Sequence, residues 1–387
     1  MKKTLFTLVL LLVASLTLSA QEALSSKAPL RSPEINADRS VTVRLYAPKA
    51  SEVKLVGDLV EKPTPLTRND EGVWSLTTPP RKSDLYSYAF EVDGVRTNDP
   101  SNVYRVRDIA SVSDIVIVPG TEGDLYSVQN VPHGTVAKVW YDSPTLGMQR
   151  RATIYTPAGY EKGKGRYPVL YLLHGMGGDE EAWAALGRAT QIFDNLIASG
   201  KARPMIVVMT NGNAIQEAAP GESSGGLQQP QFRLPRTMEG SFERSFGDVV
   251  RFIDSHYRTI PKRQSRAIAG LSMGGFHALH ISRTMPKTFD YVGLFSAATM
   301  KGEGEDFYGN WIETLQVQRD NGFSLYWIGC GVDDFLWKMN TEFRTTLDQI
   351  DFPYTFRQSE GSHTWSNWRR YLSEFMPLLF TPKTKKQ

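Results

Sequence analysis

The sequence predicts a doubly wound, mostly parallel α/β sheet preceded by a small all-β, immunoglobulin-like sandwich domain. Three observations lead to this fold class. The N-terminal part contains short segments in which apolar and polar residues alternate, without helical periodicity. From residue 152 onwards, fully apolar strand-like segments alternate with amphipathic helical ones. The apolar segment 267–269 then runs into a glycine-rich turn that carries one serine, and a helical pattern follows.

The chain of 387 residues has room for both domains. We predict a signal peptide at residues 1–20 and the sandwich at 28–120. A linker with many turn residues follows at 121–135, and the α/β domain covers 136–383.

Residues 1–20 have the pattern of a bacterial secretory signal. Two lysines precede an apolar run from Leu5 to Leu18, and small residues precede the expected cleavage before Gln21. The run is too short to span a membrane stably, and no cysteine stands at the cleavage site to carry a lipid. We therefore expect an exported protein, periplasmic or secreted, without a membrane span.

Charge and cysteine content narrow the function classes. The formal net charge is only +3, and no basic run is large enough to override this balance, which argues against a nucleic-acid partner. The single cysteine, Cys330, lies in an apolar run and is interpreted as a buried small hydrophobe. The sequence has no His-Glu-x-x-His motif and no Cys/His spacing of the kind that binds metals, so we expect neither a metal nor a cofactor.

The elements of the two domains follow from periodicity. Strands of the sandwich are predicted at 41–46, 53–57, 72–76, 85–92 and 112–118. In the second domain we predict strands at 152–157, 167–173, 205–209, 267–269, 292–295 and 325–328, and helices at 189–198, 246–257 and 365–379. The aromatic residues Trp74 and Tyr86 are interpreted as core residues, with a sugar-binding platform as the alternative.

The serine turn is the first candidate for chemistry. Gly270 and Gly274 frame Ser272 in a G-x-S-x-G pattern between a strand and a helix. A reversal this sharp strains the backbone of the serine, and side chains at the flanking positions would clash with it. The helix that follows points its N-terminal amides at the place where negative charge develops during acyl transfer. Ser272 is therefore the predicted nucleophile.

A serine nucleophile needs a base, and the base needs an acid that orients it. In this topology the three occur in the order serine, acid, histidine. Of the six histidines, only His363 follows Ser272 outside the adjoining helix, so His363 is the predicted base. The acid is expected in the loop after the strand at 325–328, where we favour Asp334 and keep Asp333 as the alternative.

An oxyanion hole needs two backbone N–H groups aimed at the developing charge. Met273, directly after the nucleophile, supplies one, and Met176 in the loop 174–178 is the predicted second donor. His174 is expected to orient that loop and not to act as the base.

Several motifs together carry a family resemblance. The segments 155–160, 172–178, 270–275 and 330–334, with Gly361 to Trp368, are similar to those of the esterase D-like carbohydrate esterases. That group includes feruloyl and acetylxylan esterases and has the α/β-hydrolase fold. The N-terminal part resembles the starch- and glycogen-binding type of sandwich. The resemblance implies a Ser-His-Asp triad and, for the two-domain arrangement, a feruloyl esterase that acts on plant cell-wall polysaccharide.

The expected substrate is feruloylated xylan or xylo-oligosaccharide. Three tryptophans beside the motifs, Trp183, Trp337 and Trp365, are candidates to line a slot for a flat aromatic acyl group, with core packing as the alternative. The long polar segment 211–240 is hypothesised to be a mobile lid over the acyl pocket. Three other functions stay open: acetylxylan esterase, siderophore esterase, and a glycan-binding protein with an inactive hydrolase domain.

Overall fold

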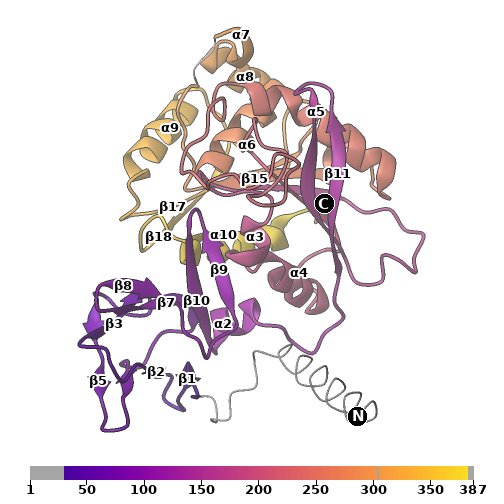
Figure 1. Ribbon diagram of the computed structural model, residues 1–387. Helices are drawn as coiled ribbons and strands as arrows, with labels where there is room; N and C mark the ends of the chain where they lie inside the picture. The colour runs from indigo at the N-terminus through magenta and orange to yellow at the C-terminus, as the bar shows by residue number, and fades with distance from the viewer. Residues whose placement is uncertain (1–29, 303–304, 382–387) are drawn as a thin grey trace, which may run out of the picture. The chain divides into compact units, whose positions relative to one another are not determined.

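The computed structural model describes residues 30–302 and 305–381 (Figure 1). The predicted signal peptide at residues 1–20 lies outside this part of the chain. The described residues fall into two compact units, one of residues 30–81 and 88–103, the other of residues 82–87 and 104–381. None of the helices within the described ranges is long and apolar enough to cross a bilayer.

The first unit is all β, as predicted. Its strands are β1 (Glu34–Ile35), β2 (Val41–Tyr46), β3 (Val53–Gly57), β4 (Thr64–Pro65), β5 (Thr67–Arg68), β6 (Val73–Thr77), β8 (Val95–Thr97) and residues 88–92 of β7 (Asp84–Val92). One sheet has the order β1-β2-β6-β5, and in the other β3 pairs with β4 and β7 while β8 pairs with β7. Alternate residues such as Val41, Val43 and Leu45 are buried, and Trp74 is a core residue that donates to the carbonyl of Ala47.

The second unit is built on an eight-stranded sheet with the order β11-β12-β14-β13-β15-β16-β17-β18. β11 and β12 pair antiparallel, β12 pairs antiparallel with β14, and the remaining pairs are parallel. The strands are β11 (Thr135–Ser143), β12 (Met148–Thr156), β13 (Val169–Leu173), β14 (Ile206–Thr210), β15 (Arg266–Leu271), β16 (Tyr291–Phe295), β17 (Leu325–Gly331) and β18 (Thr355–Ser359). This is the predicted doubly wound, mostly parallel sheet.

Helices cover both faces of this sheet (Figure 1). They are α2 (Thr121–Tyr126), α3 (Ala182–Ala185), α4 (Ala189–Ala198), α5 (Ser241–His256), α6 (Met273–Thr284), α7 (Glu305–Tyr308), α8 (Trp311–Asp320), α9 (Trp337–Gln349) and α10 (Trp365–Phe375), with short 3-10 segments at Arg263–Ser265 and Met376–Leu378. Along β13, Leu170 and Leu172 pack in the cluster that contains α4 and α10, whereas Tyr171 and Leu173 pack in the cluster that contains α5, α6, α8 and α9. Strands buried on both faces explain the continuous apolar runs in the sequence.

The structure differs from the predicted elements at several places. The hairpin of β9 (Arg105–Asp108) and β10 (Ser111–Val118) belongs to the second unit, because Val106 and Ile115 are part of the core cluster of α4 and α10. The predicted boundary at residue 120 therefore differs from this division. The C-terminal helix ends at Phe375 and not at 379, since Pro377 lacks the N–H that would continue the helix. The antiparallel strand β11 and the strand β18 were not predicted.

Candidate active site

Ser272 occupies a sharp turn between β15 and α6, as predicted. Its backbone has φ 52° and ψ −115°, a strained conformation for a residue with a side chain. Its amide donates to the carbonyl of Phe295 over 2.9 Å, and its carbonyl accepts from Phe276 and Ala298. These bonds to β16, to α6 and to the loop after β16 hold the strained turn in place.

Both glycines that flank Ser272 are required sterically. A Cβ atom on Gly270 would lie 2.2 Å from the carbonyl oxygen of Gly274. A Cβ atom on Gly274 would lie 2.4 Å from the carbonyl oxygen of Leu173 and 2.5 Å from that of His174. Because these neighbours are backbone atoms, they cannot move aside as a side chain could. The G-x-S-x-G pattern thus packs the start of α6 directly against the end of β13.

His363 and Asp334 meet beside this turn, although 29 residues separate them in the chain. Nδ1 of His363 lies 2.9 Å from each carboxylate oxygen of Asp334. The amide of Leu336 donates to Oδ1 of the same carboxylate over 2.9 Å. Burial raises the pKa of Asp334, but the hydrogen bonds from His363 and Leu336 outweigh it, and the pKa lies below its ordinary value. Asp334 is therefore ionised at neutral pH.

The structure separates the two adjacent aspartates. Asp334 is 4% exposed and faces His363, whereas the Asp333 side chain is exposed to solvent. The amide of Asp333 donates to the carbonyl of Gly361, which links the loop after β17 to the loop that carries His363. Of the two aspartates, Asp334 thus has the position that a triad acid needs, and Asp333 does not.

His174 has both ring nitrogens occupied within the loop after β13. Its Nε2 accepts from the amide of Gly212 over 2.7 Å, so Nδ1 carries the proton and donates to the carbonyl of Gly175, also over 2.7 Å. Complete burial lowers the pKa of His174 to about 4. The ring is therefore neutral and fixed. It holds the loop that contains Met176, and its arrangement agrees with the predicted orienting role.

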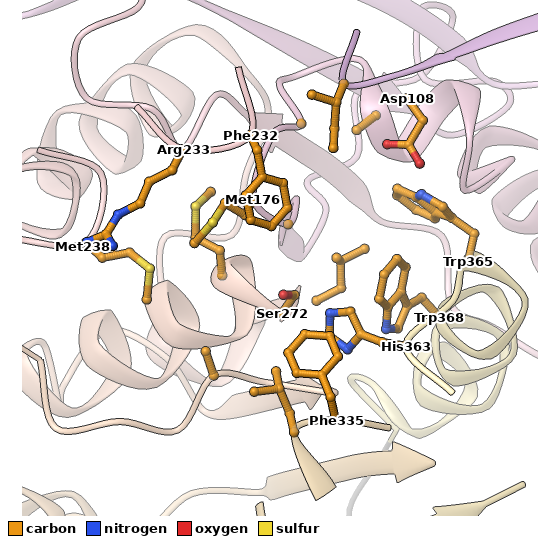
Figure 2. Close-up of a pocket in the computed structure, with 18 of the residues that line it drawn as sticks. Asp108, Met176, Phe232, Arg233, Met238, Ser272, Phe335, His363, Trp365 and Trp368 are labelled. Carbon is orange, nitrogen blue, oxygen red and sulfur yellow. The ribbon is translucent and has the colours of Figure 1, made fainter. Parts of the chain in front are cut away.

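Ser272 and His363 open into a pocket with a volume of about 470 Å³ (Figure 2). In Figure 2 the imidazole of His363 points toward Ser272, with Trp365 and Trp368 on one side and Met176 and Phe232 on another. The lining is mostly apolar and rich in aromatic and methionine side chains. Other wall residues are Asp108, Ile109, Ala182, Leu186, Arg233, Met238, Met273, Ala298, Met300, Phe335 and Leu336.

The three predicted slot tryptophans have different positions. Trp365 lines the pocket. Trp183 is 1% exposed and donates from Nε1 to the carbonyl of Leu173 over 2.9 Å. Its ring packs edge-on against the ring of Trp365, with centroids 5.3 Å apart. Trp337 is half-buried on α9, where it packs against Phe356 and not on the pocket wall. For Trp183 and Trp337 the alternative of packing roles therefore holds.

Two aromatic residues that were not predicted to line the pocket flank the imidazole of His363. The ring of Phe335 lies 4.4 Å from the imidazole of His363, and the ring of Trp368 lies 4.8 Å from it in an edge-on arrangement. Phe335 is 74% exposed, so it stands at the rim of the pocket. A signal was present, since Phe335 directly follows Asp334 and Trp368 lies on the helix after His363.

The segment 211–240 lies at the pocket, as hypothesised. Its residues Phe232, Arg233 and Met238 form part of the wall. Its earlier part is tied down, because the amide of Ala219 donates to the buried Glu180 over 2.9 Å. That the rest of the segment moves as a lid stays a prediction.

Other titratable groups lie away from this chemistry. Cys330 is completely buried, and burial raises the pKa of its thiol to about 12, in agreement with the role of a small hydrophobe. His277 and His280 are buried in α6. Within residues 30–302 and 305–381, no group of three or more His, Cys, Asp or Glu side chains is arranged to hold a metal ion.

Two known protein families match this chain. Residues 143–379 match the family described as "Putative esterase". Residues 31–106 match the family described as "Carbohydrate-binding module 48 (Isoamylase N-terminal domain)". Both matches confirm the predicted resemblance, an esterase domain preceded by a glycan-binding type of sandwich.

One curated relative is a protein of Xylanibacter ruminicola named "Endo-1,4-beta-xylanase/feruloyl esterase". It is 31% identical over 359 residues, which cover 90% of this chain and 46% of the relative. The chain thus spans less than half the length of that relative.

Solved structures are similar as well. A ferulic acid esterase matches with a TM-score of 0.53 and 29% identity, over 63% of this chain and 97% of the other. The enterobactin esterase FES of Shigella flexneri matches with a TM-score of 0.62 over 87% of this chain and 92% of the other. Because that identity is only 16%, this second likeness shows the fold alone. The family match over the α/β unit is decisive, and the chain belongs to this esterase family.

Proposed function

We propose that this protein is a serine esterase that hydrolyses ferulate or related hydroxycinnamate esters on arabinoxylan. One observation carries the proposal. The hydrogen-bonded pair of His363 and Asp334 stands beside Ser272 in a pocket with aromatic and methionine walls. The names of the Xylanibacter relative and of the ferulic acid esterase structure support the choice of acyl group.

The reaction begins with proton transfer from Ser272 to Nε2 of His363 as the serine oxygen attacks the ester carbonyl carbon. Asp334 stabilises the imidazolium that forms. The amides of Met273 and Met176 donate to the negatively charged carbonyl oxygen. When the carbon–oxygen bond to the sugar breaks, His363 returns the proton to the leaving alkoxide, and an acyl-serine remains. Water, deprotonated by His363, then releases the free acid and restores the serine.

The size and lining of the pocket favour an aromatic acyl group over acetate. A volume of about 470 Å³ lies in the range of sites that enclose a small organic ligand. An acetyl group would leave most of this apolar volume unfilled. Trp365 and Trp368 offer flat surfaces to an aromatic ring. Acetylxylan esterase is therefore the second candidate, distinguished by the acyl group.

We also propose that the protein works outside the cytoplasm. The support is the sequence pattern of residues 1–20, with two lysines, an apolar run and small residues before Gln21. Mass spectrometry of the protein recovered from its own cells tests this proposal. A mature N-terminus at Gln21 is the expected result, and a retained Met1 in a cytoplasmic fraction would contradict it.

The central experiment measures initial rates of the purified protein on methyl ferulate and on p-nitrophenyl acetate, with Ser272→Ala as the matched control. We expect ferulate release by the wild type and a loss of at least about 10⁴-fold in the variant. Rapid acetate cleavage without ferulate release would move the function to deacetylation.

If the protein cleaves neither ester, the two other candidates, a siderophore esterase and a glycan-binding protein, are favoured. A siderophore esterase would hydrolyse a catecholate siderophore ester and lose that activity in Ser272→Ala. A glycan-binding protein would retain polysaccharide equally well with and without Ser272.

A further inference from the structure

The pocket of about 470 Å³ beside Ser272 is called the ester pocket below. Its wall contains two residues from a hairpin that is distant in sequence from the loops of Ser272, Asp334 and His363. Asp108 ends β9 and Ile109 begins the turn to β10, and both line the pocket. Figure 2 shows Asp108 near Trp365. The φ angle of Ile109 is 53°, which is strained for a β-branched residue. Strain of this kind is kept where surrounding contacts fix the backbone.

Those contacts come from the loop after β13. Arg107 forms an ion pair with Asp179, which is 2% exposed, and the same guanidinium donates to the carbonyl of Ile109 over 3.0 Å. The Ile109 side chain sits on Gly177, where an added Cβ would lie only 2.6 Å from Ile109 Cγ1. The hairpin tip is therefore held beside the loop that carries the Met176 amide.

A second, smaller pocket of about 210 Å³ lies on the other side of this tip. It shares five wall residues with the ester pocket, namely Asp108, Ile109, Gly178, Ala182 and Leu186. The two pockets are thus neighbours separated by the hairpin tip. The smaller one has a different lining, because it adds Arg105, Arg107, Asp179 and Glu181.

The charges of the smaller pocket are largely paired with one another or with nearby groups. Arg107 pairs with Asp179, and Arg105 lies 3.3 Å from Asp114. Glu181 pairs with Lys138 and with Arg151. Paired charges favour a neutral ligand that offers hydroxyl groups over an ion.

Asp108 differs from these groups. In the part of the chain that the structure describes, no ion pair or hydrogen bond engages its carboxylate, and only its backbone carbonyl accepts from Ser111. Desolvation raises the pKa of Asp108, more than the nearby Arg107 lowers it. Asp108 is also exposed to solvent and lines both pockets, so its carboxylate is free to accept a hydrogen bond from a hydroxyl group of a ligand.

We propose that the smaller pocket binds the sugar that carries the acyl group, and that Asp108 accepts a hydrogen bond from a hydroxyl of that sugar. This proposal rests on the proposed function, since it places the acyl group in the apolar pocket and the alcohol on the polar side. The volume fits one sugar ring and is below that of sites for larger ligands. Asp108 is then a specificity-determining residue that distinguishes sugar esters from simple alkyl esters.

The test compares two substrates in the full-length protein: methyl ferulate, which has no sugar, and a feruloylated arabinoxylo-oligosaccharide. For Asp108→Ala we expect kcat/KM on the oligosaccharide to fall about tenfold more than on methyl ferulate, mainly through KM, as the loss of one hydrogen bond to a charged group predicts. Asp108→Asn keeps an acceptor oxygen and is expected to lose less. Asp70→Ala, an exposed aspartate in the loop between β5 and β6, controls for the loss of a negative charge.

Equal losses on both substrates would overturn the proposal, because Asp108 would then serve the acyl wall. The absence of any loss would overturn it as well. Thermal unfolding of each variant shows whether the protein still folds. If Asp108→Ala unfolds early, the two substrates are compared with Asp108→Asn, for which a smaller loss, still confined to the oligosaccharide, is expected.

A binding measurement separates this proposal from the proposed function. The unacylated arabinoxylo-oligosaccharide is titrated into the wild type and Asp108→Ala by isothermal calorimetry. Binding that weakens in Asp108→Ala supports the sugar site even if the wild type cleaves no ferulate. Equal binding, or none by either protein, would refute the sugar site even if ferulate is cleaved.

Discussion

Both carboxylate oxygens of Asp334 lie 2.9 Å from Nδ1 of His363. This bond places the proton on Nδ1 and leaves Nε2 with the lone pair that a general base needs. The amide of Leu336 also donates to the carboxylate, so the acid is held from two directions. The tautomer of His363 is therefore set by the loop after β17.

Asp334→Asn should lower kcat by about 10⁴-fold with little change in KM, because the amide can donate to Nδ1 and favour the wrong tautomer. Initial rates on the best ester substrate give both constants. Asp333→Asn is the matched control, since it makes the same chemical change at the adjacent, exposed position. A larger loss in Asp333→Asn than in Asp334→Asn would contradict the assignment of the acid.

Gly274→Ala should destabilise the fold and reduce activity together. The new methyl group would lie within 2.5 Å of two backbone oxygens, so α6 would have to shift away from β13. We expect the free energy of unfolding to drop by about 3 kcal/mol, as for a strongly overpacked core. Gly165→Ala is the control, because there an added Cβ meets only the Tyr167 side chain, at 3.9 Å or more. Urea denaturation of both variants provides the measurement, and equal stabilities would speak against the steric argument.

The positions of Ser272 and His363 could be predicted from the sequence because local chemistry marks them. Gly270 and Gly274 are needed for backbone packing within a few residues of Ser272. The order of the chain then leaves one histidine, His363, outside the adjoining helix. Such signals are short-range or topological, so they can be read without knowing how distant segments pack.

The pocket wall was predicted less well because it depends on long-range packing. Trp183 and Trp365 both lie beside motif residues, yet one is core and the other is wall. The sequence near Asp108 gives no sign that this residue lines the pocket. Its hairpin is held there by the ion pair between Arg107 and Asp179, which are 72 residues apart. The sequence favoured Asp334 over Asp333 as the acid but could not exclude Asp333, because a one-residue shift in a loop changes which side chain faces the histidine.

Trp365→Ala should raise KM for an aromatic ester while leaving kcat less affected. Trp365 forms part of the pocket wall and makes edge-on contacts with Trp183 and Trp368, with ring centroids 5.3 and 5.2 Å apart. Loss of one aromatic contact to a bound ring corresponds to about a tenfold increase in KM. Trp337→Ala is the control, since that side chain packs against Phe356 away from the pocket. Equal KM values in both variants would argue against a binding role for Trp365.

The buried His174 predicts how stability depends on pH. Its pKa is about 4 in the folded protein, because burial disfavours the charged ring, and about 6.5 in the unfolded chain. Between these two values the unfolded state binds more protons than the folded state, so stability falls as the pH is lowered. From about pH 7 to pH 5 this single group accounts for a loss of about 2 kcal/mol.

His174→Gln is the variant that isolates this contribution. The buried His280, whose pKa is also lowered well below its ordinary value by burial, is present in both proteins and affects them alike. Urea denaturation at about pH 7 and pH 5 should therefore show a smaller loss of unfolding free energy in the variant, by about 2 kcal/mol. Identical losses in the two proteins would mean that His174 takes up its proton without unfolding. The neutral ring between Gly212 and Gly175 would then not be what holds the loop that contains Met176.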